Sequence, residues 1–369
     1  MIEKNAAGAD RASAVLLERA ADAAVTAGRH AEEADRERDL SPEVAKATVA
    51  AGFARHFVPR RFGGVDGTVA NLLAATAMVG ERCTSAAWCG ALAAGAARMG
   101  AFLPEQGQAE LWADGPDAFV AGALIPSGRA EPADGGWRLT GEWPFTSGIN
   151  HADWALVAAP VPHGDTFTPY FLAVSRGQFT IRDTWHSIGM RGTGSNTLVL
   201  DDVYVPAHRA FDRDAMLLGR PIGSTARCHT VPLRALSGIL FATPALGGAR
   251  GAMRAWIAGT GGRIGADIIA DVAGRIEMAA LLLQRVADSC DAGGVSRDDT
   301  VRNPYHCAIA TDILVTATER MFRAAGSRGQ LTTSPLQRFW RDLHCLASHT
   351  ALRPEPTGVA YGRHLLNGC

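Results

Sequence analysis

The sequence predicts an α+β fold in which a central β domain separates two helical domains. Apolar residues recur with a helical period in the first third of the chain and again after about residue 210. The segment between them is divided into short runs rich in β-branched and aromatic residues. This order excludes a repeating βαβ plan, and with it most doubly wound nucleotide-binding folds. We expect domains at residues 1–116, 117–212 and 213–369.

The first domain is predicted to be helical throughout. Residues 12–36 place small apolar residues on one face and charges on the other. The Ser-Pro-Glu sequence at 41–43 begins a helix, because serine caps, proline fits the first position and an acid suits the first turn. We expect the glycine pair 63–64 to end that unit. Residues 70–102, rich in alanine, form a buried helical stretch, and 104–113 add a short helix.

The other two domains differ in their predicted secondary structure. In the central one, clusters of turn residues separate the predicted strands. These strands are residues 118–125, 137–143, 154–161, 170–174 and 197–205. In the third domain the helical period returns. The predicted helices are residues 233–257, 266–289, 300–325 and 334–352.

Composition excludes several classes of protein. The 369 residues include 47% hydrophobic ones, the formal net charge is -1 and the pI is about 6.8. A basic stripe of the kind that binds nucleic acid is absent from the sequence. The seven cysteines are odd in number and scattered, as in reduced cytosolic proteins. No apolar run of about 18 residues occurs. We therefore expect a cytoplasmic protein.

The sequence disfavours four familiar kinds of site. The glycine cluster 189–195 precedes a predicted strand, whereas a phosphate loop should open a helix. The cluster 259–265 follows a helix and not a strand, so the dinucleotide-binding requirement is not met. His344 and His349 are five residues apart and point in different directions on a helix, which disfavours a metal site. A G-x-S-x-G nucleophile elbow is absent from the sequence.

Residues 141–154 carry more information. Trp143, Phe145, Thr146, Ser147 and Gly148 bring aromatic, hydroxyl and glycine residues together where a strand ends. Aromatic rings can flank a planar ligand, hydroxyls can bond its polar edge, and glycine allows close backbone approach. A decorated β-turn is the alternative interpretation.

Residues 336–349 form the second informative segment. Arg338, Arg341 and Asp342 have the spacing of a charge network on one helix face. His349 lies two turns beyond Asp342. A lone histidine in a helix can also be a surface or satisfied core residue, and we interpret His151 in the earlier segment as structural.

Several segments taken together resemble the acyl-CoA dehydrogenase superfamily, and more narrowly its flavin-dependent monooxygenase branch. That branch includes the oxygenase components of two-component aromatic hydroxylases and the dibenzothiophene monooxygenase. The resemblance covers nearly the whole chain and implies an N-terminal helical domain, a central β-barrel or sandwich and a C-terminal helical bundle. It rests on residues 59–64 (PRRFGG), 85–88 (SAAW), 143–148 (WPFTSG), 189–195 (GMRGTGS), 201–206 (DDVYVP) and 341–349 (RDLHCLASH).

The resemblance separates the two branches at one position. Dehydrogenases carry a glutamate base within Tyr-Glu-Gly-Thr shortly after the Arg-Asp pair. Here the stretch 347–351 reads ASHTA, and Glu355 stands between two prolines, a poor replacement. The resemblance implies that His349 is the catalytic acid or base, as in the monooxygenase branch. Imidazole titrates near neutrality and suits that role.

The resemblance also implies the other site residues. Ser147 would bond the N5 and C4a region of the flavin and stabilise the oxygen adduct. Gly326 would approach the phosphate end of the cofactor across a subunit interface. Arg338 and Arg341 would organise their helix and the interface. The residues expected to line the isoalloxazine are Phe145, Thr146 and Ser147, and those expected on the substrate side are Trp88, Ala96 and Met190.

The implied function is a two-component monooxygenase. A separate flavin reductase supplies reduced FMN or FAD by diffusion, and O2 forms a C4a-(hydro)peroxide that hydroxylates a small aromatic or polyketide-like substrate in specialised metabolism. A homotetramer is expected. Two departures leave room for N-oxidation or lost catalysis: relatives place a second histidine near the level of Ala96, and the connection at 259–265 is short. An acyl-thioester dehydrogenase and a non-redox scaffold are the competing hypotheses.

Overall fold

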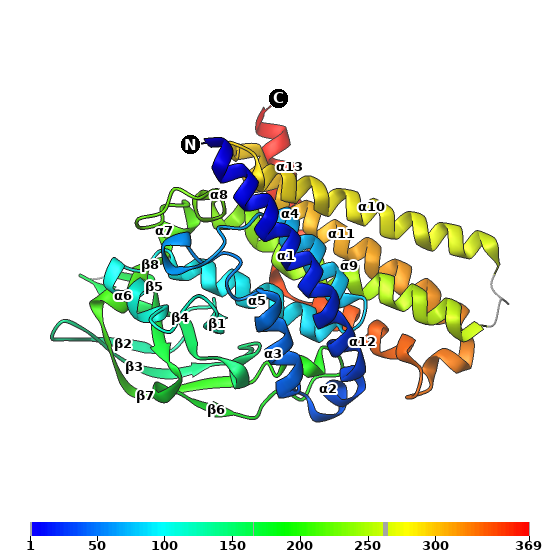
Figure 1. Cartoon of the computed structure of the whole chain (residues 1–369), viewed down its shortest axis with the longest axis horizontal. Helices are drawn as coiled ribbons and strands as arrows, with labels where there is room; N and C mark the ends of the chain where they lie inside the picture. Colours follow the sequence, from blue (N-terminus) through cyan, green and yellow to red (C-terminus); the bar gives the residue numbers. More distant parts are fainter. Residues whose placement is uncertain (1, 165, 261–264, 369) are drawn as a thin grey trace.

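The computed structural model describes residues 2–164, 166–260 and 265–368, and it confirms the α+β plan. Helices come first, two four-stranded sheets follow, and a bundle of long helices completes the chain (Figure 1). None of the helices within the described residues has an apolar stretch that could span a bilayer. The N-terminal helices are α1 (Ile2–Arg29), α2 (Ala31–Glu37), α3 (Pro42–Ala51), α4 (Val69–Gly80), α5 (Thr84–Gly100) and α6 (Glu105–Leu111).

The start of α3 is the one predicted from its capping residues. Ser41 is the N-cap and its hydroxyl accepts the Val44 N–H, with proline at the first helical position. The predicted end is wrong. Gly52, at φ +100°, ends α3, because glycine takes the left-handed conformation of a C-cap without strain. The glycine at 63 instead ends the short 3-10 helix η1 (Arg60–Phe62). The stretch 70–102 is two helices, α4 and α5, which are separated at residues 81–83.

The central part of the chain forms two four-stranded sheets. One sheet has the order β1-β4-β5-β8, with β1 parallel to β4, and the other has the order β2-β3-β7-β6 and is antiparallel. Strands β2, β6 and β8 were not predicted, because β2 contains a proline and the other two are three residues long. The bounds are β1 (Val120–Ala123), β2 (Arg129–Ala133), β3 (Gly136–Trp143), β4 (Trp154–His163), β5 (Thr166–Ser175), β6 (Thr180–Arg182), β7 (Thr197–Pro206) and β8 (Ala210–Asp212).

Helix α9 is the centre of the C-terminal bundle. It contacts α4 and α5 of the N-terminal part as well as α10, α11 and α12 (Figure 1). The stretch of α9 from 235 to 249 consists almost entirely of apolar and small residues and is buried apart from Ser237, whereas Arg254 and Ile257 near its end are exposed. The glycine cluster 259–265 begins in the last turn of α9, and its residues 261–264 lie outside the described residues. The bounds are α7 (Arg213–Leu217), α8 (Arg227–Thr230), α9 (Leu233–Thr260), α10 (Ala266–Asp291), α11 (Arg297–Ala324), α12 (Pro335–Ala347) and α13 (Pro354–Gly368).

The end of α12 differs from the prediction of one helix over 334–352. The helix stops at Ala347, and His349 is the N-cap of the 3-10 helix η7 (Thr350–Leu352). Pro354 then begins α13, which was not predicted. Proline cannot continue a preceding helix but fits the first turn of a new one, so the chain turns here. His349 is therefore held by a turn and not by the regular spacing of a helix.

Candidate active site

The end of β3 and the segment before β7 are joined into one surface. The Thr146 N–H donates to the carbonyl of Asn196 (3.0 Å) and the Gly148 N–H donates to that of Thr193 (2.8 Å). Thr146 is buried, and its hydroxyl donates to the carbonyl of Trp143 (2.9 Å). Phe145 has φ +61° and a side chain that is 70% exposed. The predicted flavin segment thus presents a mostly exposed aromatic ring, which meets Trp185 edge-on at 6.2 Å, on a well-anchored turn.

A chain of hydroxyl groups runs inward from this turn. The Trp88 indole N–H donates to Ser147 Oγ (3.0 Å), which lies 2.8 Å from Ser195 Oγ. Ser195 Oγ lies 2.6 Å from Thr193 Oγ1, whose hydroxyl donates to the carbonyl of Met190 (2.8 Å). Ser147 is partly exposed, whereas Ser195 and Thr193 are buried. We call Ser147, Ser195 and Thr193 the hydroxyl chain.

Ser195 and Thr193 were not predicted as site residues. The glycine cluster 189–195 was considered as a phosphate loop and as part of the family resemblance, and neither residue was given a role. A signal was present, because hydroxyl residues flank a glycine just before a strand, but the pairing of that segment with residue 147 is a tertiary contact.

His349 stands against an aromatic wall formed by two other helices. Its ring stacks on Phe241 of α9, with 4.0 Å between centroids and 25° between planes. Trp88 of α5 meets it edge-on at 5.7 Å and 74°. Trp88 therefore contacts His349 with its ring and Ser147 with its N–H. The structure brings together these three residues, which the sequence analysis named from distant segments.

The electrostatics of His349 define its protonation. Burial lowers the pKa of His349 to about 4, so the ring is neutral at pH 7. The Ala351 N–H donates to its Nδ1 (3.2 Å), which leaves the ring proton on Nε2. Nε2–H is the group of this residue that remains available to a ligand.

Helix α12 contacts the glycine cluster 189–195. Asp342 Oδ1 accepts the N–H of Met190 (2.6 Å), and burial raises the pKa of Asp342 to about 7. Arg341 pairs with Asp35 of α2 (2.7 Å). A side chain on Gly189 would overlap the carbonyl of Arg341. Arg341 also donates to Gln337 of its own helix (2.7 Å), but its ion pair and the hydrogen bond of Asp342 join α12 to other elements.

Two predicted substrate residues lie elsewhere. Ala96, two turns from Trp88 on α5, belongs to a separate apolar cluster with Met99 and Val120 under β1. Met190 is buried, and its backbone is occupied by the hydroxyl chain and Asp342. The structure does not bring Ala96 to the aromatic wall.

His151 and Glu355 both lie outside the site formed by Ser147, Trp88 and His349. His151 lies 3.2 Å from Asp39, an ion pair when the imidazole is protonated, which agrees with the structural interpretation of His151. Glu355 is exposed in the first turn of α13. It is not packed where the dehydrogenase base would have to be.

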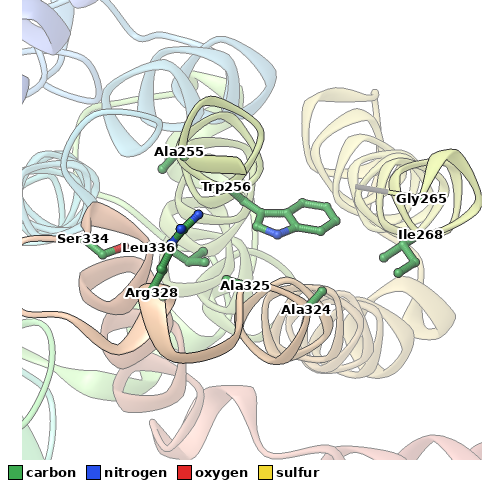
Figure 2. A pocket seen from close by; sticks show the side chains of 11 residues that line it. Ala255, Trp256, Gly265, Ile268, Ala324, Ala325, Arg328, Ser334 and Leu336 are labelled. Atoms are coloured by element: carbon green, nitrogen blue, oxygen red, sulfur yellow. The ribbon is translucent and has the colours of Figure 1, made fainter. Parts of the chain in front are cut away.

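A cavity of about 250 Å³ lies beside the predicted phosphate-binding residue, Gly326. Arg328, Trp256 and Ser334 line it from three different elements (Figure 2). The Trp256 Nε1 is buried without a hydrogen-bond partner among the described residues. Gly326 itself has φ +60° and nothing within 4 Å of a built Cβ, so its backbone is open to approach.

Comparisons with known proteins agree with this arrangement. The acyl-CoA dehydrogenase C-terminal domain family matches residues 239–354. The oxygenase component of an FADH(2)-dependent resorcinol hydroxylase from Rhizobium sp. (strain MTP-10005) is 31% identical over 342 residues, which cover 84% of this chain and 83% of the relative.

Two solved structures are similar over nearly the full length. The 3-HSA hydroxylase from Rhodococcus sp. RHA1 has a TM-score of 0.91 at 27% identity, covering 95% of this chain and 97% of its own. XiaF from Streptomyces sp., solved with FADH2 and glycerol, has a TM-score of 0.90 at 25% identity, covering 99% and 98%. With the motifs and the fold in agreement, the chain belongs to the flavin-dependent monooxygenase branch of the acyl-CoA dehydrogenase superfamily.

Proposed function

We propose that this protein is the oxygenase component of a two-component monooxygenase that hydroxylates a small phenolic substrate. When bound, reduced FMN or FAD supplies the electrons that activate O2, as a C4a-(hydro)peroxide. A separate reductase supplies the flavin by diffusion. The observation that carries the proposal is the meeting of Ser147, Trp88 and His349 beside the exposed ring of Phe145.

The residues of the turn fit an isoalloxazine ring. Phe145 offers an exposed aromatic face, and Ser147 offers a hydroxyl on the same strand end. Thr146 is fully buried, with its N–H bonded to the Asn196 carbonyl and its hydroxyl to that of Trp143, so it holds the turn in shape and does not face the ring. These contacts orient a planar ring and exclude water from one of its sides.

The cavity beside Gly326 fits the phosphate end of the cofactor. Arg328 supplies a cation and several donors for a phosphate, and the unpartnered Trp256 N–H supplies one more. In this proposal, as the family resemblance implies, one flavin uses the turn of one subunit and the cavity of another. A homotetramer is the proposed assembly.

His349 would act on the substrate oxygen as a donor. Its Nε2 carries the proton and its Nδ1 is held by the Ala351 N–H. For a substrate bound as its phenolate, whose proton has already gone to solvent, a hydrogen bond from Nε2–H to the oxygen stabilises the negative charge and so keeps the ring activated. The aromatic wall of Phe241 and Trp88 suits an aromatic substrate beside it. The resorcinol hydroxylase relative supports a phenolic substrate. We place the reaction in specialised metabolism.

The test is a coupled assay with labelled oxygen. The purified protein would be mixed with a flavin reductase, NADH, FMN or FAD, ¹⁸O₂ and a panel of mono- and dihydroxybenzenes. We expect a hydroxylated product with one ¹⁸O atom, formed only with both proteins present. Products without ¹⁸O, or none from any phenol while reduced flavin binds, would reject a phenol hydroxylase. Anaerobic bleaching of bound oxidised flavin by an acyl thioester would identify a dehydrogenase instead.

A further inference from the structure

The hydroxyl chain contains as many protons as it has acceptors, and this fixes the direction of every hydrogen bond in it. Four contacts join Trp88, Ser147, Ser195, Thr193 and the carbonyl of Met190. The protons available are one indole N–H and three hydroxyl hydrogens. The indole can only donate and the carbonyl can only accept, so both ends of the chain are determined.

The directions follow from the inner end outward. The single proton of Thr193 goes to the carbonyl of Met190, so Thr193 must accept from Ser195. The proton of Ser195 is then used, so Ser195 must accept from Ser147. Ser147 accepts from Trp88 and donates inward. Its hydroxyl therefore presents only a lone pair to the partly exposed side.

The inner end of the chain is held in place. Met190 has φ +52°, and its N–H donates to the buried carboxyl of Asp342. Its carbonyl also accepts the Trp185 indole N–H (2.9 Å). Thr193 and Ser195 are 1% and 5% exposed, so water does not compete for their hydroxyls. The acceptor at the end of the chain is thus rigid and dry.

We propose that Ser195 and Thr193 are positioning residues that make the site prefer reduced over oxidised flavin. The inference rests on the proposed function. Reduced isoalloxazine carries a hydrogen on N5 and can donate it to the lone pair of Ser147. Oxidised isoalloxazine has a lone pair on N5, which meets the lone pair of Ser147 without a proton between them. A reductase partner requires this preference, because spent flavin must leave and reduced flavin must bind.

The test compares affinities for the two redox states of the cofactor. FMN and FAD would be titrated into the wild-type protein and its variants, oxidised in air and reduced under anaerobic conditions. The measured quantity is the ratio of the oxidised to the reduced Kd. Ser195→Ala removes the acceptor of the Ser147 proton, which becomes free to turn outward. Loss of one such bond is worth roughly 1 kcal/mol or more, so we expect the ratio to fall about tenfold.

Thr193→Val is the sharper variant. It lies two hydrogen bonds from Ser147, and the carbonyl of Met190 keeps its other donors. Without Thr193 as acceptor, Ser195 can donate to Ser147, and the Ser147 proton then points outward. The ratio should fall at least as far as in Ser195→Ala. Ser195→Thr retains the hydroxyl and should keep the ratio. Thr318→Val is the control, because its buried hydroxyl only donates to its own helix.

The outcomes separate the two proposals. A fall in the ratio for both variants, with Thr318→Val unchanged, supports the inference. A tenfold fall corresponds to a midpoint potential of bound flavin lower by about 30 mV for two electrons. Equal weakening of both redox states, or an unchanged ratio, would overturn it and leave the proposed function intact. If the wild-type protein binds neither redox state of FMN or FAD, the proposed function fails as well. Thermal unfolding of each variant checks that it is folded.

Discussion

The two sides of the site are built by different physical means. The hydroxyl chain consists of small polar groups, each satisfied by a neighbour at 2.6–3.0 Å. The aromatic wall around His349 consists of ring contacts at 4.0–5.7 Å, with one hydrogen bond to the imidazole, from Ala351. Hydrogen bonds fix direction and tolerate few substitutions, whereas apolar packing fixes volume and tolerates exchanges of similar size. The comparison suggests that the cofactor side is constrained and the substrate side adaptable.

The largest expected effect tests His349, which stands against the aromatic wall. His349→Ala should lower turnover by roughly 10²–10³, the usual loss when one stabilising donor is removed. Flavin affinity should stay close to that of the wild type, because His349 contacts rings and not the hydroxyl chain. Single-turnover product formation and flavin titration measure the two quantities. His344→Ala is the control, since its Nδ1 pairs with a carbonyl of its own helix. Wild-type turnover in His349→Ala would refute the assignment.

The second prediction concerns the carboxyl that anchors the hydroxyl chain. The raised pKa of Asp342, about 7 against 3.8, means that the folded state holds this proton more tightly than the unfolded chain. The contribution of this bound proton to the stability of the folded state is fully present below about pH 4 and is lost as the pH rises through 7.

Asp342→Asn resembles the protonated form and keeps an oxygen for the Met190 N–H. The variant should gain stability relative to the wild type as pH rises, by as much as about 4 kcal/mol above pH 7, because the pKa is raised by about 3 units at ~1.4 kcal/mol per unit. Urea unfolding from pH 4.5 to 8.5 measures it. Parallel stability curves for the two proteins would contradict the prediction.

The third prediction tests the close approach of α12 to the glycine cluster. In Gly189→Ala the new methyl group overlaps the carbonyl of Arg341, so the loop must move away from the helix. We expect a loss of roughly 1–3 kcal/mol in the free energy of unfolding and weaker flavin binding. Gly177→Ala is the matched control, because nothing lies within 4 Å of its Cβ position. Equal stability of the two variants would show that the contact is not needed.

The smallest expected effect concerns the ion pair between Arg341 of α12 and Asp35 of α2. Arg341→Lys loses the paired hydrogen bonds to Asp35, and both side chains are about a fifth exposed. The cost should stay below about 1 kcal/mol, with turnover unchanged. Arg338→Lys is the comparison, since Arg338 lies over the ring of Phe339. A loss of turnover in Arg341→Lys would mean that this ion pair positions the site.

Local signals predicted the parts of the fold that depend on local physics. The Ser-Pro-Glu start of α3 and the five predicted strands, β1, β3, β4, β5 and β7, are present because capping and β-branched or aromatic composition act over a few residues. The short strands β6 and β8 have too few residues to show a period. The end of α12 was overestimated because the apolar spacing continues past Ala347, while the turn is imposed by the prolines that follow.

The candidate site was predictable only in part for the same reason. Ser147 and His349 stand in motifs and were named from them. The bond from Asp342 to Met190 joins residues 152 positions apart, and that from Ser147 to Ser195 joins residues 48 positions apart. Such contacts depend on how helices and sheets dock, which single-residue patterns do not encode. Phe241 was missed because it is one apolar residue among many in α9.

The conformation of Phe145 has a consequence for the stability of the protein when no flavin is bound. Its left-handed φ of +61° is strained for an aromatic residue, and its ring stands 70% in water. Both features disfavour the empty state, and a planar guest that covers the ring relieves the second. Under the proposed function the protein takes its flavin from solution and is empty for part of the time, so added flavin should raise its resistance to heat and proteases.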